Sequence, residues 1–132
     1  MDISGRIEGC VKNVCSNYVM VKASCAEIPS VGEGVYVISD GKITIIGYSR
    51  NVRDRLLRYC RGDLDIRGMA LLLMGNLEHV IPNVKTANDT LARRGELRRN
   101  LVKIISSAGI FVVGCPGVKA SRLYEVLSKC LG

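Results

Sequence analysis

The feature that most constrains the fold of this chain is a predicted β-hairpin with two apolar faces. Asp40 and Gly41 separate two runs of mainly β-branched residues within 35–48. This pair is the strongest short-range hairpin signal, because both residues of a two-residue turn must adopt positive φ. Such a turn would place Ile38 opposite Ile43 and leave both faces of the hairpin largely apolar. Because a solvated sheet has one polar face, this hairpin must be covered on both sides, by barrel closure, by the rest of the chain or by another subunit.

The periodicity of the other segments predicts an α/β (α+β) fold with a β-rich front and a helical back. Alternating apolar residues predict strands at 5–11 and 18–23. With the hairpin, these strands would form a small N-terminal β-meander or partial barrel over residues 1–49. This module would pack on a basic α/β unit over residues 50–132, and we expect the two to form one compact structural unit.

The back half is predicted to alternate helices and strands. Their order is a helix at 51–61, a strand at 68–75, a helix at 87–108, a strand at 110–113 and a helix at 119–131. Asn51 can cap the first of these helices, and Gly62 and Gly109 mark helix ends. If the two strands are adjacent and parallel, this unit contains a right-handed βαβ crossover.

The cysteine content favours structural disulfides over a metal site. The six cysteines are Cys10, Cys15, Cys25, Cys60, Cys115 and Cys130. Zinc sites need closely spaced ligand pairs, whereas the closest cysteines here have four residues between them and His79 is the single histidine. We therefore expect no metal and no other cofactor.

Disulfides inside cells are common in hyperthermophiles. The chain has no Gln, and 12 of its 19 basic residues are Arg, which is a composition typical of a heat-adapted protein. One pairing is excluded, between Cys115 and Cys130, if the first ends a strand and the second ends the next helix. A helix of about 13 residues is about 20 Å long, far beyond the reach of a disulfide.

Charge is distributed unevenly along the chain, which has a net charge of +7. Residues 1–49 include four basic and five acidic residues, whereas residues 50–132 include 15 basic and seven acidic ones. This asymmetry points to a polyanionic partner such as DNA or RNA. The candidate nucleic-acid-binding residues form two arginine clusters: Arg50, Arg53, Arg55, Arg58 and Arg61, then Arg93, Arg94, Arg98 and Arg99. Guanidinium groups bind phosphates bidentately, and the alternative is a pair of solvated helix faces joined by ion pairs.

A loop at 114–121 is a second candidate for anion binding. It follows an apolar strand and opens a helix, where backbone N–H groups can hold a phosphate. The candidate residues are Gly114, Gly117, Lys119 and Ser121. The loop resembles a P-loop, G-x-x-x-x-G-K-[ST], in which the spacing of the glycine, lysine and serine is altered by single-residue insertions. The alternative is a strand-to-helix turn that is shaped by its proline and glycines.

No motif in the sequence identifies an enzyme, because His79 has no catalytic partner in its neighbourhood and no catalytic residue can be named. The apolar runs are shorter than the roughly 18–20 residues of a membrane span, and no secretory signal follows Met1. We therefore expect a cytoplasmic, non-enzymatic module that binds nucleic acid and has no membrane partner. The alternatives are a disulfide-stabilised homo-oligomeric structural or assembly protein, indicated by the two-sided hairpin, and a small phosphate- or nucleotide-binding protein that uses residues 114–121.

Overall fold

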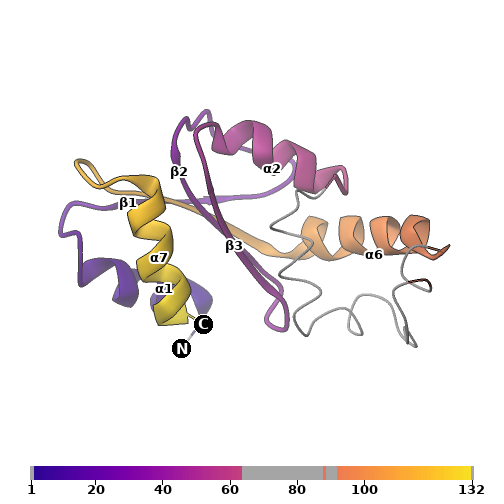
Figure 1. Cartoon of the computed structure of the whole chain (residues 1–132), viewed down its shortest axis with the longest axis horizontal. Coiled ribbons are helices and arrows are strands. Elements are labelled where there is room, and N and C mark those ends of the chain that lie inside the picture. The colour runs from indigo at the N-terminus through magenta and orange to yellow at the C-terminus, as the bar shows by residue number, and fades with distance from the viewer. Residues whose placement is uncertain (1, 64–87, 89–91, 132) are drawn as a thin grey trace.

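The protein has a mixed α+β fold, with helices on both sides of a single antiparallel sheet. The computed structural model describes residues 2–63, 88 and 92–131. The elements in chain order are α1 (Ile3–Lys12), β1 (Val19–Ala23), β2 (Gly34–Ser39), β3 (Thr44–Ser49), α2 (Val52–Cys60), α6 (Arg94–Ser107), β4 (Gly109–Gly114) and α7 (Ala120–Leu131). Figure 1 shows α1 and α7 on one side of the sheet and α2 and α6 on the other. The α+β fold class predicted from the sequence is confirmed.

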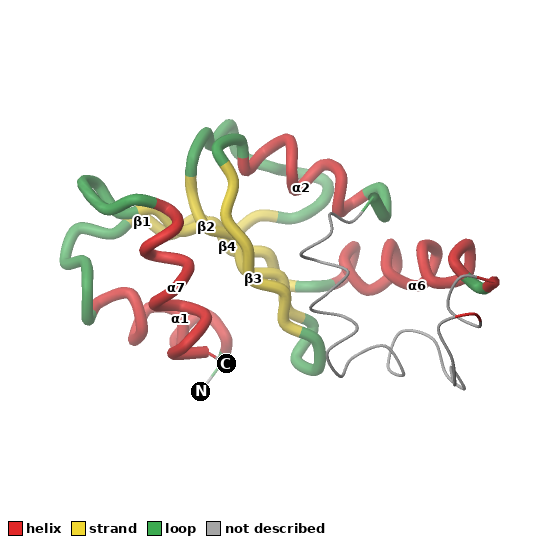
Figure 2. The backbone as a smooth tube through the Cα atoms, in the orientation of Figure 1, coloured by secondary structure: helices red, strands yellow, loops and turns green. Residues whose placement is uncertain are grey.

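The strand order is β1-β4-β2-β3, and each described pair of neighbouring strands is antiparallel. Strand β4 comes from the back of the sequence, yet it lies between β1 and β2. Figure 2 shows the strands in the middle of the molecule with helices on either side. The front therefore does not form a meander by itself, because both halves of the chain contribute to one sheet. The strand predicted at 68–75 lies outside the described residues, so the βαβ crossover stays a prediction.

The two apolar faces of the hairpin are confirmed, and this chain's own helices cover both of them. Every residue of β2 is buried. Tyr36 and Ile38 pack in a core with the apolar residues of α2 and α6, whereas Val35 and Val37 pack in a second core with those of α1 and α7. The covering partner that the hairpin requires is thus supplied within the chain. The homo-oligomer predicted from the hairpin stays a prediction, but this argument for it no longer applies.

The predicted register of the hairpin is wrong by two residues. Ile38 pairs with Ile45 rather than with Ile43. The cause is the Asp40 side chain, whose Oδ1 accepts hydrogen bonds from the backbone N–H groups of Lys42 at 2.9 Å and Ile43 at 2.7 Å. These bonds form a longer loop in place of the two-residue turn. A shift of two residues leaves every side chain on its original face, so the prediction of two apolar faces is unaffected.

The strand predicted at 5–11 is instead part of helix α1. Asp2 caps this helix, and its Oδ1 accepts a hydrogen bond from the backbone N–H of Gly5 at 2.9 Å. The buried residues Ile7 and Val11 are four apart and lie on one face of the helix. Their spacing also fits the alternation of a strand, which is why the sequence pattern was ambiguous in this short segment.

Three helical predictions in the back half can be compared with the structure. Asn51 caps α2, because its side-chain oxygen accepts a hydrogen bond from the N–H of Asp54 at 3.1 Å, and Gly62 follows the helix with a φ of 81°. Helix α7 matches the segment predicted at 119–131 to within a residue. Gly109 is not a helix cap, however: it is the first residue of β4, and the cap position of α6 is Ala108.

All six cysteines form disulfides, which confirms the predicted disulfide bonds. The pairs are Cys10–Cys130, Cys15–Cys115 and Cys25–Cys60. The excluded pairing of Cys115 with Cys130 is indeed absent. The first two disulfides lie on the side of α1 and α7, where Cys10 and Cys15 are buried in the core, Cys115 is half-buried and Cys130 is exposed. The third packs against the core of α2 and α6, and both of its cysteines are half-buried. Within the described part of the chain, no helix is both long and apolar enough to cross a bilayer.

Candidate nucleic-acid interface

The first arginine cluster lies on the outer face of α2. Val52, Leu56 and Tyr59 are buried against the sheet at helical spacing, so the positions between them face outward. The outward positions of this segment are largely arginines. Arg50, Arg53, Arg58 and Arg61 are exposed, and Arg55 is half-buried.

The second cluster lies on α6, which shares this side of the sheet with α2 (Figure 1). Leu97, Leu101 and Ile105 bury the inner face of α6. Arg98 and Arg99 are exposed. Of the two remaining predicted residues, Arg93 precedes the helix and is half-buried, whereas Arg94 begins the helix with a side chain that lies outside the described part of the structure.

The two clusters meet at a contact that we call the arginine junction, made by Arg61, Gly62, Asp63 and Arg98. Arg98 Nη2 lies 3.1 Å from Asp63 Oδ1, and Arg61 Nε lies 3.9 Å from Asp63 Oδ2. Arg98 Nε also donates a hydrogen bond to the carbonyl oxygen of Arg61 at 3.2 Å. One aspartate thus holds two guanidinium groups that are far apart in the sequence.

Gly62 makes this close approach possible. A Cβ at this position would lie 2.6 Å from Arg98 Cγ and 3.0 Å from Val102 Cγ2, and the φ of 81° is itself one that glycine tolerates best. Gly62, which follows the C-cap residue of α2, therefore also sets how closely α6 can pack. The sequence predicted the first role of Gly62 but not the second.

Two further ion pairs of this surface lie within the described residues. Arg58 Nε lies 3.4 Å from Asp54 Oδ2, and both side chains are about half exposed, a setting in which ion pairs contribute little to stability. Arg93 donates two hydrogen bonds to Glu96, at 2.8 and 2.9 Å. Segments 50–63 and 93–103 together hold ten basic and three acidic residues. Among the described residues, the alternative interpretation, a face of paired ions, applies to Arg58, Arg61, Arg93 and Arg98.

The pKa of the Glu96 carboxyl group is lowered by the arginines around it. Its hydrogen bonds with Arg93 hold its pKa below the ordinary value, and the charges of Arg93 and Arg99 act in the same direction. Partial desolvation opposes this shift but is the weaker influence. The ionised form of Glu96 is therefore favoured, and it pairs with Arg93.

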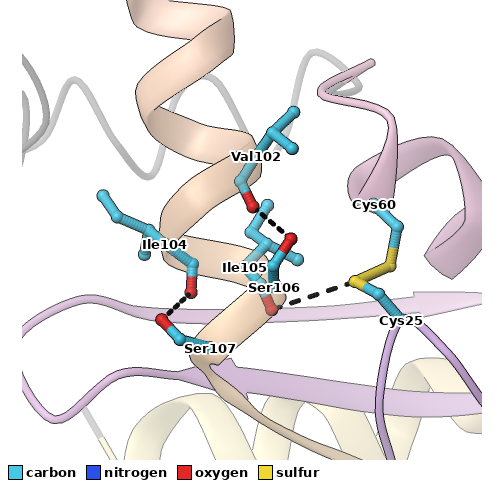
Figure 3. Close-up of a disulfide and its surroundings, with 7 residues drawn as sticks. All are labelled: Cys25, Cys60, Val102, Ile104, Ile105, Ser106 and Ser107. Carbon is cyan, nitrogen blue, oxygen red and sulfur yellow. Dashed lines mark hydrogen bonds between the residues drawn. A yellow bond between two sulfur atoms is a disulfide. The ribbon is translucent and has the colours of Figure 1, made fainter.

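The Cys25–Cys60 disulfide lies directly beside the arginine junction. Cys60 is the last residue of α2 and precedes Arg61, whereas Cys25 follows β1. Figure 3 shows the disulfide next to α6, with Cys25 Sγ 3.9 Å from the carbonyl oxygen of Ile105. Both cysteines are half-buried. The sequence predicted disulfides but gave no reason to connect one of them with the arginines, because the contact is made by residues from three separate segments.

The loop at 114–121 lies away from the arginine clusters. It forms part of a cavity of about 370 Å³, where β4 ends and α7 begins. Gly114, Gly117 and Lys119 line it, and Gly117 has a φ of 83°. Ser121, the fourth predicted residue, is exposed and is not part of the lining. Glu33 lines the same cavity and adds a negative charge, which disfavours a phosphate. The structure thus brings together three of the four candidate residues, but in surroundings poorly suited to an anion.

The described residues include no candidate metal site, and the chain matches no known protein in the comparisons made. Among the residues that the structure describes, no three His, Cys, Asp or Glu side chains lie where they could hold a metal ion, and His79 lies outside that part of the chain. Comparisons with protein-family models, with curated proteins and with solved structures give no match to this chain.

Proposed function

We propose that this protein is a non-enzymatic module that binds the phosphate backbone of nucleic acid with the outer surface of α2 and α6. The observation that carries the proposal is the arginine junction, where both predicted clusters meet on one side of the sheet. Arginine side chains in such a group can each reach a phosphate, and the release of counterions from the nucleic acid then favours binding. The binding residues would be Arg50, Arg53, Arg55, Arg58, Arg61, Arg93, Arg94, Arg98 and Arg99.

The positions of the aromatic rings favour contact with phosphates over stacking on bases. Tyr36, Tyr59 and Phe111 are buried in the two cores. Tyr48 and Tyr124 pack against each other, with ring centroids 5.2 Å apart, in the core on the side of α1 and α7. Proteins that bind single strands without sequence preference stack bases on exposed aromatic side chains. This arginine surface instead resembles one that recognises charge.

The proposal is tested by a matched pair of charge reversals. Arg58→Glu changes the proposed surface, and Arg122→Glu makes the same change on α7, on the opposite side of the sheet. The two residues are well matched, because each is an exposed helical arginine with one acidic partner in its own helix, at 3.4 Å for Arg58 and 3.5 Å for Arg122. Fluorescence anisotropy with short single-stranded and double-stranded DNA and RNA would measure the affinities at about 50 and 200 mM salt.

We expect the unmodified protein to bind at low salt and to weaken as salt rises. Arg58→Glu should lower affinity about tenfold and reduce the slope of log K against log salt by about one, because a phosphate contact is lost. Arg122→Glu should change affinity less than about twofold, since long-range charge effects are screened beyond a Debye length. Equal losses in the two variants, or no binding to any probe at low salt, would contradict the proposal.

A further inference from the structure

We propose that the Cys25–Cys60 disulfide is a redox switch for this arginine surface. In the closed form it holds the end of α2 against α6, and its reduction weakens nucleic-acid binding. The inference rests on the proposed function, because it concerns the regulation of that same surface. It goes further by assigning to two residues outside the arginine clusters the control of how those clusters are arranged.

The first support is the position of the bond. Cys60 is the residue directly before Arg61, so the disulfide fixes the backbone at the start of the arginine junction. On its other side, Cys25 Sγ contacts the carbonyl oxygen of Ile105 in α6 (Figure 3). The bond therefore connects the end of α2 covalently to a segment that packs directly on α6.

The second support is that no other disulfide serves this side of the sheet. Cys10–Cys130 and Cys15–Cys115 both lie on the side of α1 and α7, and each holds together segments that the other also holds. Opening one of those two leaves α1 and α7 connected through the other. Opening Cys25–Cys60 removes the whole covalent connection at the arginine junction.

The reduction is an ordinary thiol–disulfide exchange with a dithiol reductant. A thiolate of the reductant attacks one sulfur, the S–S bond breaks, and the bonding electron pair leaves with the other sulfur, which then takes up a proton. The second thiolate of the reductant then attacks the reductant's own sulfur in the mixed disulfide, and the protein's cysteine leaves as a thiolate that takes up a proton. Both cysteines become thiols, and the dithiol is oxidised to a disulfide. Cys25 and Cys60 are both half-buried, so neither residue is fully enclosed.

The consequence of reduction is local. Val52, Leu56 and Tyr59 remain buried, so α2 stays on the sheet. The Cys25 thiol gains a hydrogen that it can donate to the Ile105 carbonyl, and so it can stay beside α6 while Cys60 is released. The residues that follow Tyr59, from Cys60 to Asp63, then gain freedom to move. The contact of Arg61 with a rigid row of phosphates becomes less favourable because more conformational entropy is lost on binding.

The test compares two disulfide-deficient variants of the full chain. C25A/C60A removes the proposed switch, and C15A/C115A removes a disulfide from the other side of the sheet. Affinity for the same nucleic-acid probe is measured in non-reducing buffer at low salt, with circular dichroism used to confirm folding at that temperature. C25A/C60A should bind about fivefold more weakly than the unmodified protein, and C15A/C115A should bind within about twofold of it.

A second measurement keeps the inference testable if C25A/C60A does not fold. The unmodified protein is treated with increasing dithiothreitol, and alkylation with mass spectrometry identifies the cysteines that are reduced. Affinity should fall as Cys25 and Cys60 become reduced and should return on reoxidation. Unchanged affinity with this bond open, or an equal loss in C15A/C115A, would overturn the switch but leave the proposed function standing. If the fully oxidised protein binds no probe, the proposed function itself fails, and the switch fails with it.

Discussion

The two sides of the sheet are built alike but stabilised differently. Within the described part of the chain, a pair of helices on each side buries an apolar core against the same four strands. The side of α1 and α7 has two disulfides, whereas the side of α2 and α6 has one disulfide and both arginine clusters. The comparison shows that most of the disulfides lie on one side of the sheet and both arginine clusters on the other.

The two disulfides of the α1 and α7 side are nested. Their partners are separated by 120 residues for Cys10–Cys130 and by 100 for Cys15–Cys115. While one of them is closed, the other restricts only the short segments 10–15 and 115–130, or about 20 residues in all. The separation of 35 residues in Cys25–Cys60 is unaffected by either. If one nested disulfide is lost, the other therefore still provides most of the restriction of the unfolded chain.

The largest expected effect comes from removing both nested disulfides. Loop entropy gives a cost of about 3 kcal/mol for either one alone and about 8 kcal/mol for both, because the second removal releases a loop of about 100 residues. Guanidinium chloride unfolding of C10A/C130A, C15A/C115A and the fourfold variant would measure this. Domains of this size have a free energy of unfolding of about 5–15 kcal/mol. The fourfold variant should therefore be marginally stable or unfolded in the absence of denaturant.

The control for this prediction is C25A/C60A, which should cost about 4 kcal/mol on the same basis. If C25A/C60A loses as much free energy of unfolding as the fourfold variant, the two sides of the sheet do not differ in how much their disulfides stabilise them. Costs for the two nested disulfides that add without any excess would show that neither compensates for the loss of the other.

A smaller effect is expected from adding one methyl group on each side of the sheet. Gly62→Ala should destabilise the protein by about 1–3 kcal/mol, because the residue has a positive φ and its Cβ would meet Arg98. Gly9→Ala is the matched change in α1, where a Cβ meets nothing within 4 Å. This change should stabilise the protein by about 0.5–1 kcal/mol, since Ala favours a helix over Gly. Thermal unfolding measures both, and effects of the same sign would refute the close packing at Gly62.

The smallest effect concerns pH. Since Arg93 lowers the pKa of Glu96 in the folded protein, the stability due to this pair is present above the unfolded pKa of the carboxyl and is lost as pH falls through the folded pKa. An NMR titration of the Glu96 side chain should show ionisation below the ordinary value, and Arg93→Ala should return the pKa upward. A Glu96 pKa that does not respond to Arg93→Ala would exclude this pair as the cause.

The sequence correctly predicted the elements that are specified by residues close together in the chain. The helix after Asn51, the hairpin at Asp40 and the helix that became α7 all depend on residues within a few positions of each other. Helix α1 was missed because Ile7 and Val11 fit a period of two as well as a period of four, and a segment of ten residues is too short to separate them. Its capping residue, Asp2, was the signal that could have decided between the two.

Long-range features could not be predicted in the same way. The insertion of β4 between β1 and β2 depends on burial across the whole sheet. At the candidate site, the arginines were found from the sequence, but Asp63 and the contact between Gly62 and Arg98 were not. These contacts join residues about 35 positions apart, and no local pattern specifies which distant segments will meet.

The nested disulfides have a further consequence when the two ends of the chain are pulled apart. Force applied through α1 and α7 passes from Cys10 to Cys130, and the next bond in its path is Cys15–Cys115. Every strand of the sheet, together with α2 and α6, lies between residues 15 and 115 in the sequence. In the oxidised protein, tension at the ends is therefore carried by covalent bonds, and the sheet and its arginine surface bear none of the load.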